Sequence, residues 1–300
     1  MGSIMSARNV LSLGLGVLLC TGISFGQAPS TLRQEQPPIP VEEIIKKFSE
    51  REREFRIARG NYTYRQDVTM QELNANGRVL GEYHVVSDIL FDSSGKRTEK
   101  IVYAPASTLG KGPSTVSLDA EDLQDVREIQ PFVLTSDDIG KYNLKYLGKE
   151  KVDEIDCYVF DVAPKTIEKG QRYFQGQIWV DDQDLQIVKT YGKAVPDIHG
   201  KGGEEHLFPR FETYREQIDK YWFPTYTKAV DTLQFSTGAK RIREIIKYEN
   251  YKKFEANVKL TFGDAVEGGP ADQNPSTSSD KKAPALDPRL NDSTSKTKKK

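Results

Sequence analysis

The side chains that most often carry metal or acid–base chemistry are few in this chain and lie far apart. None of the three histidines, His84, His199 and His206, sits in a metal-binding or catalytic motif. Glu204 and Glu205 precede His206, and the three could in principle bind a metal ion, but a solvated strand entrance is the simpler interpretation. The sequence therefore predicts no metal site and no cofactor.

Carboxylates are the second group with chemical potential. The run at 181–184 holds three aspartates and could form a calcium or acid–base cluster, although such a run is more typical of a hairpin turn. A hydrolase would need Asp161, Asp181 and Glu212 to converge in a cleft with perturbed pKa values. The sequence contains no nucleophile elbow, zincin helix or phosphate-cradling loop. We therefore predict that the protein is not an enzyme.

The composition indicates a globular core and argues against a nucleic-acid partner. The chain has 300 residues, of which 37% are hydrophobic and 10% aromatic. Lys and Arg number 43 against 44 Asp and Glu, for a formal net charge of -1, so the basic background of a general nucleic-acid binder is missing. Cys157 stands among apolar neighbours, which predicts a buried, inert thiol.

The first 28 residues have the order of a secretory signal peptide. Arg8 precedes an apolar run that ends at Cys20, and small residues follow. The run is shorter than a spanning helix and holds glycines, so cleavage is favoured over a membrane anchor. Lipidation at Cys20 is less favoured, because the bulky Leu19 stands where a small residue is usual. We expect a periplasmic or otherwise exported protein.

Two solvated segments flank one predicted domain. Residues 29–40 are rich in Pro and Gln and form a linker. Residues 264–300 are almost free of large apolar side chains and predict a disordered polar tail. The tail ends in three lysines, for which a solubilising role is the simpler interpretation than contact with an anionic surface. The working domain is therefore predicted to span 41–263.

The domain opens with one amphipathic helix and continues in strands. The helix is predicted over 40–59, with an apolar stripe that includes Ile44, Phe48 and Phe55 and with Gly60 at its end. A second, short helix is expected at 135–141. Alternating apolar residues predict strands at 62–70, 83–91, 97–104, 142–148, 154–163, 172–180, 185–193, 206–218, 220–235 and 239–254. The connections are short, which is typical of antiparallel hairpins.

These elements predict an α+β fold that is mainly antiparallel β. Too few helices exist to cover a flat sheet of about ten strands, so the sheet must curve. We expect a half-open curved sheet or incomplete β-barrel, with the N-terminal amphipathic helix and short helices packed in or over its concave side. Several strands carry apolar residues on both faces, as Ile178 and Trp179 illustrate. A second buried face requires a second layer or a ligand.

Several segments resemble the periplasmic lipoprotein carriers of the LolA/LolB type and the related RseB-type sensors. They are PFVLTSDDI at 131–139, CYVFDVAPK at 157–165, GQIWVD at 176–181 and LQIVK at 185–189. The resemblance covers about 41–191. The carriers place an Arg-Pro pair in the hairpin after their second strand, whereas Arg97 here lies near that place but out of register. The three long strands at 210–254 are also more than the carriers need, which indicates a relative with a different cargo.

The resemblance implies a cavity that receives acyl chains of a lipid or lipoprotein, for transport to the outer membrane, with transient membrane contact. The alternative is an envelope protein-binding or regulatory sensor module that uses the same curved sheet. Each candidate for the cavity lining is also an ordinary core residue. The candidates are Tyr64, Val68, Val85, Ile89, Phe91, Phe132, Phe160, Ile178 and Trp222.

Overall fold

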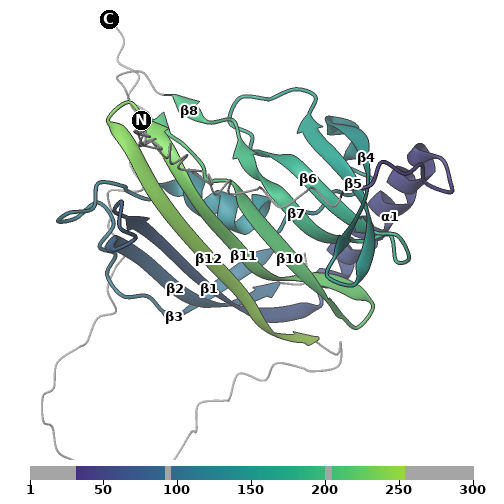
Figure 1. Ribbon diagram of the computed structural model, residues 1–300. Coiled ribbons are helices and arrows are strands. Elements are labelled where there is room, and N and C mark those ends of the chain that lie inside the picture. Colours follow the sequence, from purple (N-terminus) through teal and green to yellow (C-terminus); the bar gives the residue numbers. More distant parts are fainter. Residues whose placement is uncertain (1–31, 92–95, 200–204, 254–300) are drawn as a thin grey trace, which may run out of the picture. The chain divides into compact units, whose positions relative to one another are not determined.

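The computed structural model describes residues 32–91, 96–199 and 205–253 (Figure 1). These residues belong to one compact unit. The predicted signal peptide (1–28) with Cys20, the predicted polar tail (264–300) and the end of the predicted domain (254–263) lie outside the described residues. No helix within the described ranges has both the length and the apolar character needed to cross a bilayer.

The helix α1 spans Val41–Arg59, as the apolar stripe predicts. Pro40 precedes its first turn, which carries two glutamates, and the last turn carries two arginines, in line with the helix dipole. Ile44, Phe48 and Phe55 are fully buried on the predicted stripe. Glu52 is buried on the same stripe, which the apolar pattern does not indicate.

Ten strands form one antiparallel sheet. Their bounds are β1 Tyr62–Leu73, β2 Val79–Phe91, β3 Arg97–Tyr103, β4 Tyr142–Val152, β5 Ile155–Pro164, β6 Tyr173–Asp181, β7 Ile187–Val195, β10 Phe211–Ile218, β11 Tyr221–Phe235 and β12 Gly238–Lys253. The order across the sheet is β3-β2-β1-β12-β11-β10-β7-β6-β5-β4. The short strands β8 Ile198–His199 and β9 Glu205–His206 pair separately. The sheet is not closed, because β3 and β4 have no common ladder, and the predicted half-open curved sheet is confirmed.

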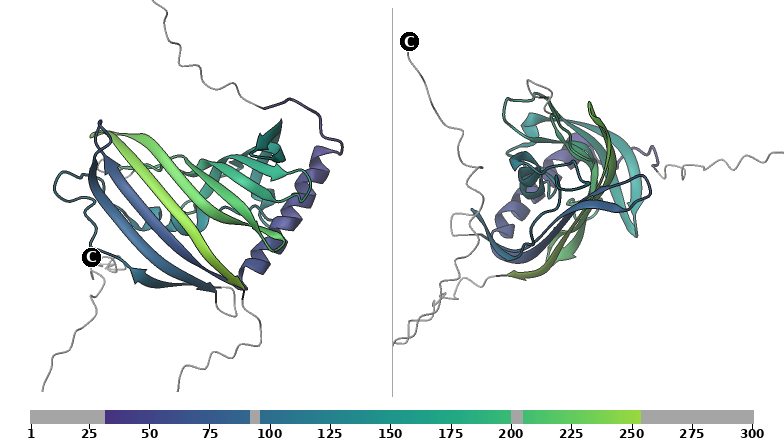
Figure 2. Two further views of the ribbon diagram at one scale, coloured as in Figure 1. Left: turned by 60° about the horizontal axis from the view of Figure 1, so that its bottom comes forward. Right: turned by 90° about the vertical axis from the view of Figure 1, so that its left-hand side faces the viewer.

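The concave side of the sheet holds the main core (Figure 2). Phe48 of α1 packs against Phe160 of β5 with ring centroids 5.6 Å apart, and Ile178 of β6 belongs to the same cluster. A second cluster lies over β1, β2 and β12 and includes Val68 and Ile246. In β1 burial alternates from Tyr62 onward, which fits a strand with one face on the core. The helix α1 therefore covers only one end of the concave side.

The opposite face of β5–β7 is also apolar and is covered by a thin layer. Cys157, Val159 and Trp179 are buried there, and the N-terminal segment adds Leu32. Arg33 pairs with Lys149 of β4 through two backbone hydrogen bonds of 2.7 and 2.8 Å. The Lys189 ammonium lies 4.7 Å from the Trp179 ring. The N-terminal segment therefore provides part of the second layer that the apolar faces predict. The predicted burial of the Cys157 thiol is confirmed, and burial raises its pKa to about 12.

Three local predictions differ from the structure. The stretch predicted as a helix at 135–141 is a turn followed by the 3-10 helix η2, Ile139–Lys141. Gly148, where a predicted strand ends, lies instead at a bulge inside β4, and the Arg33 carbonyl approaches it so closely that a side chain would have no room. The pattern also missed two consecutive helical pieces, α2 Ala120–Gln124 and the π-helix η1 Asp125–Ile129.

Candidate functional site

The helical segment formed by α2 and η1 crosses the concave side and divides its interior (Figure 2). Asp119 starts the segment with a capping box, because its carboxylate accepts from the Asp122 N–H and the Asp122 carboxylate accepts from the Asp119 N–H. Ile129 packs into the core beside α1, and Val126 packs into the cluster over β1 and β12. Two hollows result, which we call cavity 1 and the basic cleft.

Cavity 1 has a volume of about 240 Å³ and lies between the helical segment and strands β1, β10, β11 and β12. Slightly more than half of its wall is apolar. The apolar lining side chains include Met70, Leu109, Leu118, Phe208, Phe211, Leu233, Phe235 and Ile242. The polar end is formed by Asp119, Asp122, Asp125, Gln130 and Glu244. Cavity 1 is thus a hollow of mixed character, with a large apolar surface, a cluster of carboxyls at one end and further polar side chains from β1, β12 and residues 115–117.

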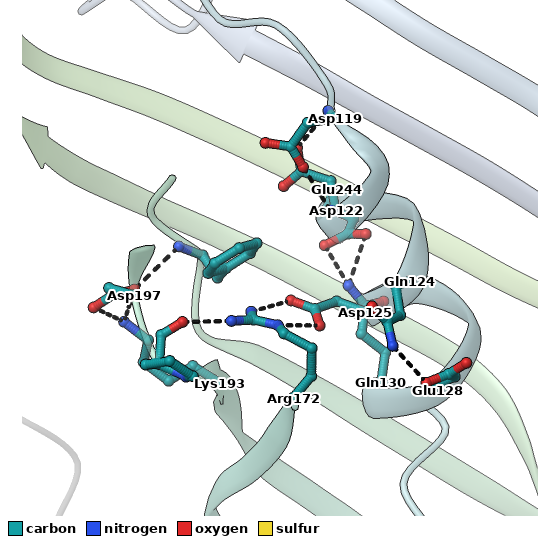
Figure 3. Close-up of polar contacts among 12 residues, drawn as sticks. Asp119, Asp122, Gln124, Asp125, Glu128, Gln130, Arg172, Lys193, Asp197 and Glu244 are labelled. Atoms are coloured by element: carbon teal, nitrogen blue, oxygen red, sulfur yellow. Dashed lines mark hydrogen bonds and ion pairs between the residues drawn. The ribbon is translucent and has the colours of Figure 1, made fainter. Parts of the chain in front are cut away.

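A buried ion pair fixes one side of that polar end (Figure 3). Arg172 donates to both carboxylate oxygens of Asp125, at 3.0 and 2.6 Å, and also to the Pro196 carbonyl. Both side chains are almost fully buried. The Arg172 guanidinium lies 3.8 Å from the centre of the Phe208 ring, which is part of the cavity wall. The pair therefore ties η1 to the start of β6 and to the chain after β7.

Glu244 forms the other side of the polar end. The Gln130 amide nitrogen donates to both of its carboxylate oxygens at 2.8 Å, while the buried Gln130 Oε1 has no hydrogen-bond partner. Burial raises the pKa of Glu244 to about 7 and the pKa of Asp122 to about 8. Asp122 is consequently largely neutral at pH 7, whereas Glu244 is about half ionised there and largely neutral only at lower pH.

The Glu244→Gln variant is expected to flatten the dependence of stability on pH. The folded-state pKa of Glu244 lies above the ordinary 4.5, so its contribution to stability is full below about pH 4.5 and is lost as the pH rises to about 7. The expected loss is on the order of 3 kcal/mol over that window. Urea unfolding between pH 4 and pH 8 measures it.

The matched control for this experiment is Glu249→Gln, on an exposed position of the same strand. The control should keep the wild-type pH profile. If Glu244→Gln and Glu249→Gln give the same profile, Glu244 does not titrate as described.

The basic cleft is the larger hollow, with a volume of about 900 Å³. It lies on the other side of the helical segment, and it shares no lining residue with cavity 1. Its lining has seven basic side chains, which are Arg56, Arg59, Lys96, Arg97, Arg127, Lys141 and Arg172, and four acidic ones, which are Glu99, Glu128, Asp138 and Glu168. Five aromatic side chains complete it, namely Tyr64, Phe91, Phe132, Tyr142 and Tyr173.

The predicted lining residues separate into three groups. Tyr64, Phe91 and Phe132 line the basic cleft. Val68, Val85, Ile89, Phe160 and Ile178 are packed in the two concave core clusters. Trp222 packs on the opposite face with Trp179. A role of these side chains in ligand binding stays a prediction, and none of the nine lines cavity 1.

Sequence reasoning missed the residues that do line cavity 1. Leu233 and Phe235 were assigned to a strand, but alternation alone does not separate a residue facing a hollow from one facing the core. The only available signal for the polar end was the spacing of Asp119 and Asp122 ahead of Leu123, Val126 and Ile129, which is a helix start followed by an apolar stripe.

The three carboxylates of the hydrolase hypothesis have separate surroundings. The Asp181 carboxylate accepts from the N–H groups of Gln183 and Asp184, which confirms the hairpin turn. Glu212 pairs with Lys189 and Lys228. Asp161 is exposed on β5.

Comparison with known proteins gives distant structural matches. A family model described as an uncharacterized protein matches residues 132–255. A DUF1329 family protein from Desulfovibrio piger is 18% identical, with 74% of this chain and 95% of that chain covered and a TM-score of 0.37. A LolA superfamily protein from Nitrosomonas europaea is 13% identical, with 72% and 94% covered and a TM-score of 0.34.

A chain from the MucA/MucB complex of Pseudomonas aeruginosa is also similar, with 13% identity, 67% and 98% covered and a TM-score of 0.20. No curated protein matches the chain. A LolA superfamily protein, the type that the sequence segments resemble, is thus among these matches.

Proposed function

We propose that the chain is an exported, non-enzymatic binding protein that holds acyl chains of a lipid or lipoprotein in cavity 1. The observation that carries this proposal is the hollow beside the concave core, whose wall holds a large apolar surface. Its walls come from β1, β10, β11 and β12 together with the helical segment, so the fold itself creates the hollow. The predicted signal peptide supports export, and delivery of the cargo to the outer membrane would follow from such a role.

The chemistry of cavity 1 suits the end of an acyl chain. Each buried methylene contributes about 0.8 kcal/mol, so a short stretch of chain supplies useful affinity. The Glu244 carboxyl and the Gln130 amide lie at one end, and Gln130 Oε1 is without a partner there. In its neutral form the Glu244 carboxyl can donate to the carbonyl of an ester or amide linkage, and Gln130 Oε1 can accept from an amide N–H, without the cost of burying a charge.

The substitution Leu233→Asp is expected to lower the affinity for an environment-sensitive fluorescent fatty acid at least tenfold. The new carboxylate would stand in the apolar wall of cavity 1, where it must lose hydration when a chain enters. Val230→Asp is the control, because Val230 lies on the same strand with 58% of its surface exposed and outside the cavity lining.

Native mass spectrometry of the purified protein should also show co-purified lipid bound to the chain. Denaturation should release that lipid. Equal probe affinities for the two variants, with no co-purifying lipid, would show that cavity 1 does not hold acyl chains.

The second candidate function is an envelope protein-binding or sensor module. It is favoured by the edge strand β3, where Ile101, Val102 and Tyr103 are each about half exposed at 58%, 49% and 52%. An open strand edge with apolar side chains can accept a strand from a partner. A single partner that stays bound in detergent and is lost in Ile101→Lys would support this function, whereas loss of the partner in detergent would favour the acyl-binding function.

A further inference from the structure

Among the described residues, the basic cleft contains one arginine that forms no ion pair within 4 Å. Most of the other cations in the cleft have carboxylate partners. Asp138 pairs with Arg56 at 2.9 Å and with Lys141 at 2.8 Å. Glu99 pairs with Arg97 at 3.0 Å and with Arg127 at 3.5 Å. The cation that differs is Arg59, at the end of α1.

The Arg59 guanidinium lies over the Phe91 ring, 5.7 Å from its centre. Its Nε atom is buried and has no hydrogen-bond partner, and no carboxylate of the described residues forms an ion pair with it. Burial lowers the pKa of the guanidinium, because desolvation disfavours the charged form. The Arg59 side chain as a whole is partly exposed, and a partly desolvated cation without an ion-pair partner in a cleft indicates a site where a ligand supplies the partner.

A second unsatisfied donor borders the same cleft. Arg97 donates from Nη1 to Glu99 and from Nη2 to Gln66 at 2.8 Å, while its buried Nε has no hydrogen-bond partner. Tyr64, Phe91 and Phe132 supply apolar surface beside the two arginines. The cleft thus combines basic side chains for one anionic group with apolar surface for the rest of a ligand.

We propose that the basic cleft binds the phosphate headgroup of an anionic lipid, with Arg59 as the main donor and Arg97 beside it. A guanidinium matches the geometry of phosphate oxygens and pairs with them through charge-assisted hydrogen bonds. The five aromatic side chains and the volume of about 900 Å³ exceed what a free phosphate needs. This site goes beyond the proposed function, because cavity 1 lies on the other side of the helical segment and shares none of its lining.

The test is calorimetric titration of the full mature chain with short-chain dioctanoyl phosphatidic acid, dioctanoylglycerol and inorganic phosphate. Phosphatidic acid should bind, and both dioctanoylglycerol and inorganic phosphate should bind more weakly. Arg59→Met should weaken phosphatidic acid at least about tenfold, because one charged hydrogen-bonding partner is lost. Arg51→Met is the matched control, because this substitution removes the same charge. Arg51 lies on the exposed face of α1, outside the cleft lining.

A second readout separates ligand binding from a structural role. Without lipid, Arg59→Met should raise the midpoint of urea unfolding, because it removes a partly desolvated charge that has no ion-pair partner among the described residues, and Arg51→Met should leave the midpoint unchanged. Unchanged phosphatidic acid affinity in Arg59→Met overturns the proposal. If inorganic phosphate binds as tightly as phosphatidic acid, the lipid assignment is wrong. It is also wrong if the protein binds polyglutamate through Arg59 but binds no lipid.

The two sites fail separately in these experiments. Leu233→Asp should keep the wild-type affinity for phosphatidic acid, because Leu233 lines only cavity 1. If the fatty-acid probe binds the Leu233→Asp and Val230→Asp variants equally, the function of cavity 1 is wrong, while a loss of phosphatidic acid binding in Arg59→Met still supports the basic cleft.

Discussion

The Arg215→Met variant is expected to lose about 3–5 kcal/mol of unfolding free energy, because it leaves the buried Glu52 carboxylate without its partner. Arg215 of β10 donates from Nη1 to both Glu52 oxygens at 3.1 Å and also to the Ile187 carbonyl at 3.3 Å. The side chains are 1% and 0% exposed. This pair joins α1 to the sheet, since Glu52 also accepts from the Ile187 N–H.

A double variant tests whether the loss comes from the orphaned charge. Burial raises the pKa of Glu52, and Arg215 and the Ile187 N–H act against that rise. Glu52→Leu combined with Arg215→Met removes both charges and should recover much of the lost stability. Equilibrium urea unfolding of the wild type, both single variants and the double variant measures the coupling. A double variant that is as unstable as the sum of the singles would show that the two residues act independently.

The Phe160→Ala variant is expected to lose about 3–5 kcal/mol, because a fully buried ring leaves a cavity that its neighbours fill only in part. The Phe160 ring packs against Phe48 of α1 at 5.6 Å and against Tyr146 of β4 at 5.5 Å between centroids. The matched variant is Phe91→Ala, which removes the same ring from the partly exposed wall of the basic cleft.

Phe91→Ala should cost much less stability, because its ring is only partly buried. Thermal unfolding followed by circular dichroism compares the two variants. Equal losses would contradict the assignment of Phe160 to the filled core and of Phe91 to the cleft.

The sequence pattern predicts the frame of this fold because each strand and α1 carry their own periodicity. The alternation of β1 places Tyr64 and Val68 on one face, and the structure buries that face. The same reasoning fails for Glu52, since a glutamate in a helix normally indicates a solvated position, and only the partner on β10, more than 160 residues away, makes its burial tolerable.

The candidate site is less predictable from the sequence, because it depends on where the helical segment 120–129 packs against the sheet. Phe160 and Leu233 both occupy concave-side positions on long strands, yet α1 covers Phe160 and leaves Leu233 beside a hollow. Nothing within a strand distinguishes the two cases. The position of the helical segment 120–129 determines which of the two residues faces a hollow. Its apolar stripe of Leu123, Val126 and Ile129 is too short to predict where on the sheet the segment packs.

The order of the strands also determines when the chain can fold. β1 pairs with β2 on one side and with β12, the last strand, on the other. The free edge of β1 in the β1–β3 meander can therefore pair only after β12, near the end of the described residues, has been synthesised. Contacts between residues so far apart in sequence form slowly. Until β12 has been synthesised, β1 and β11 both expose open edges. The ten-stranded sheet can therefore be completed only after the residues of β12 have been synthesised.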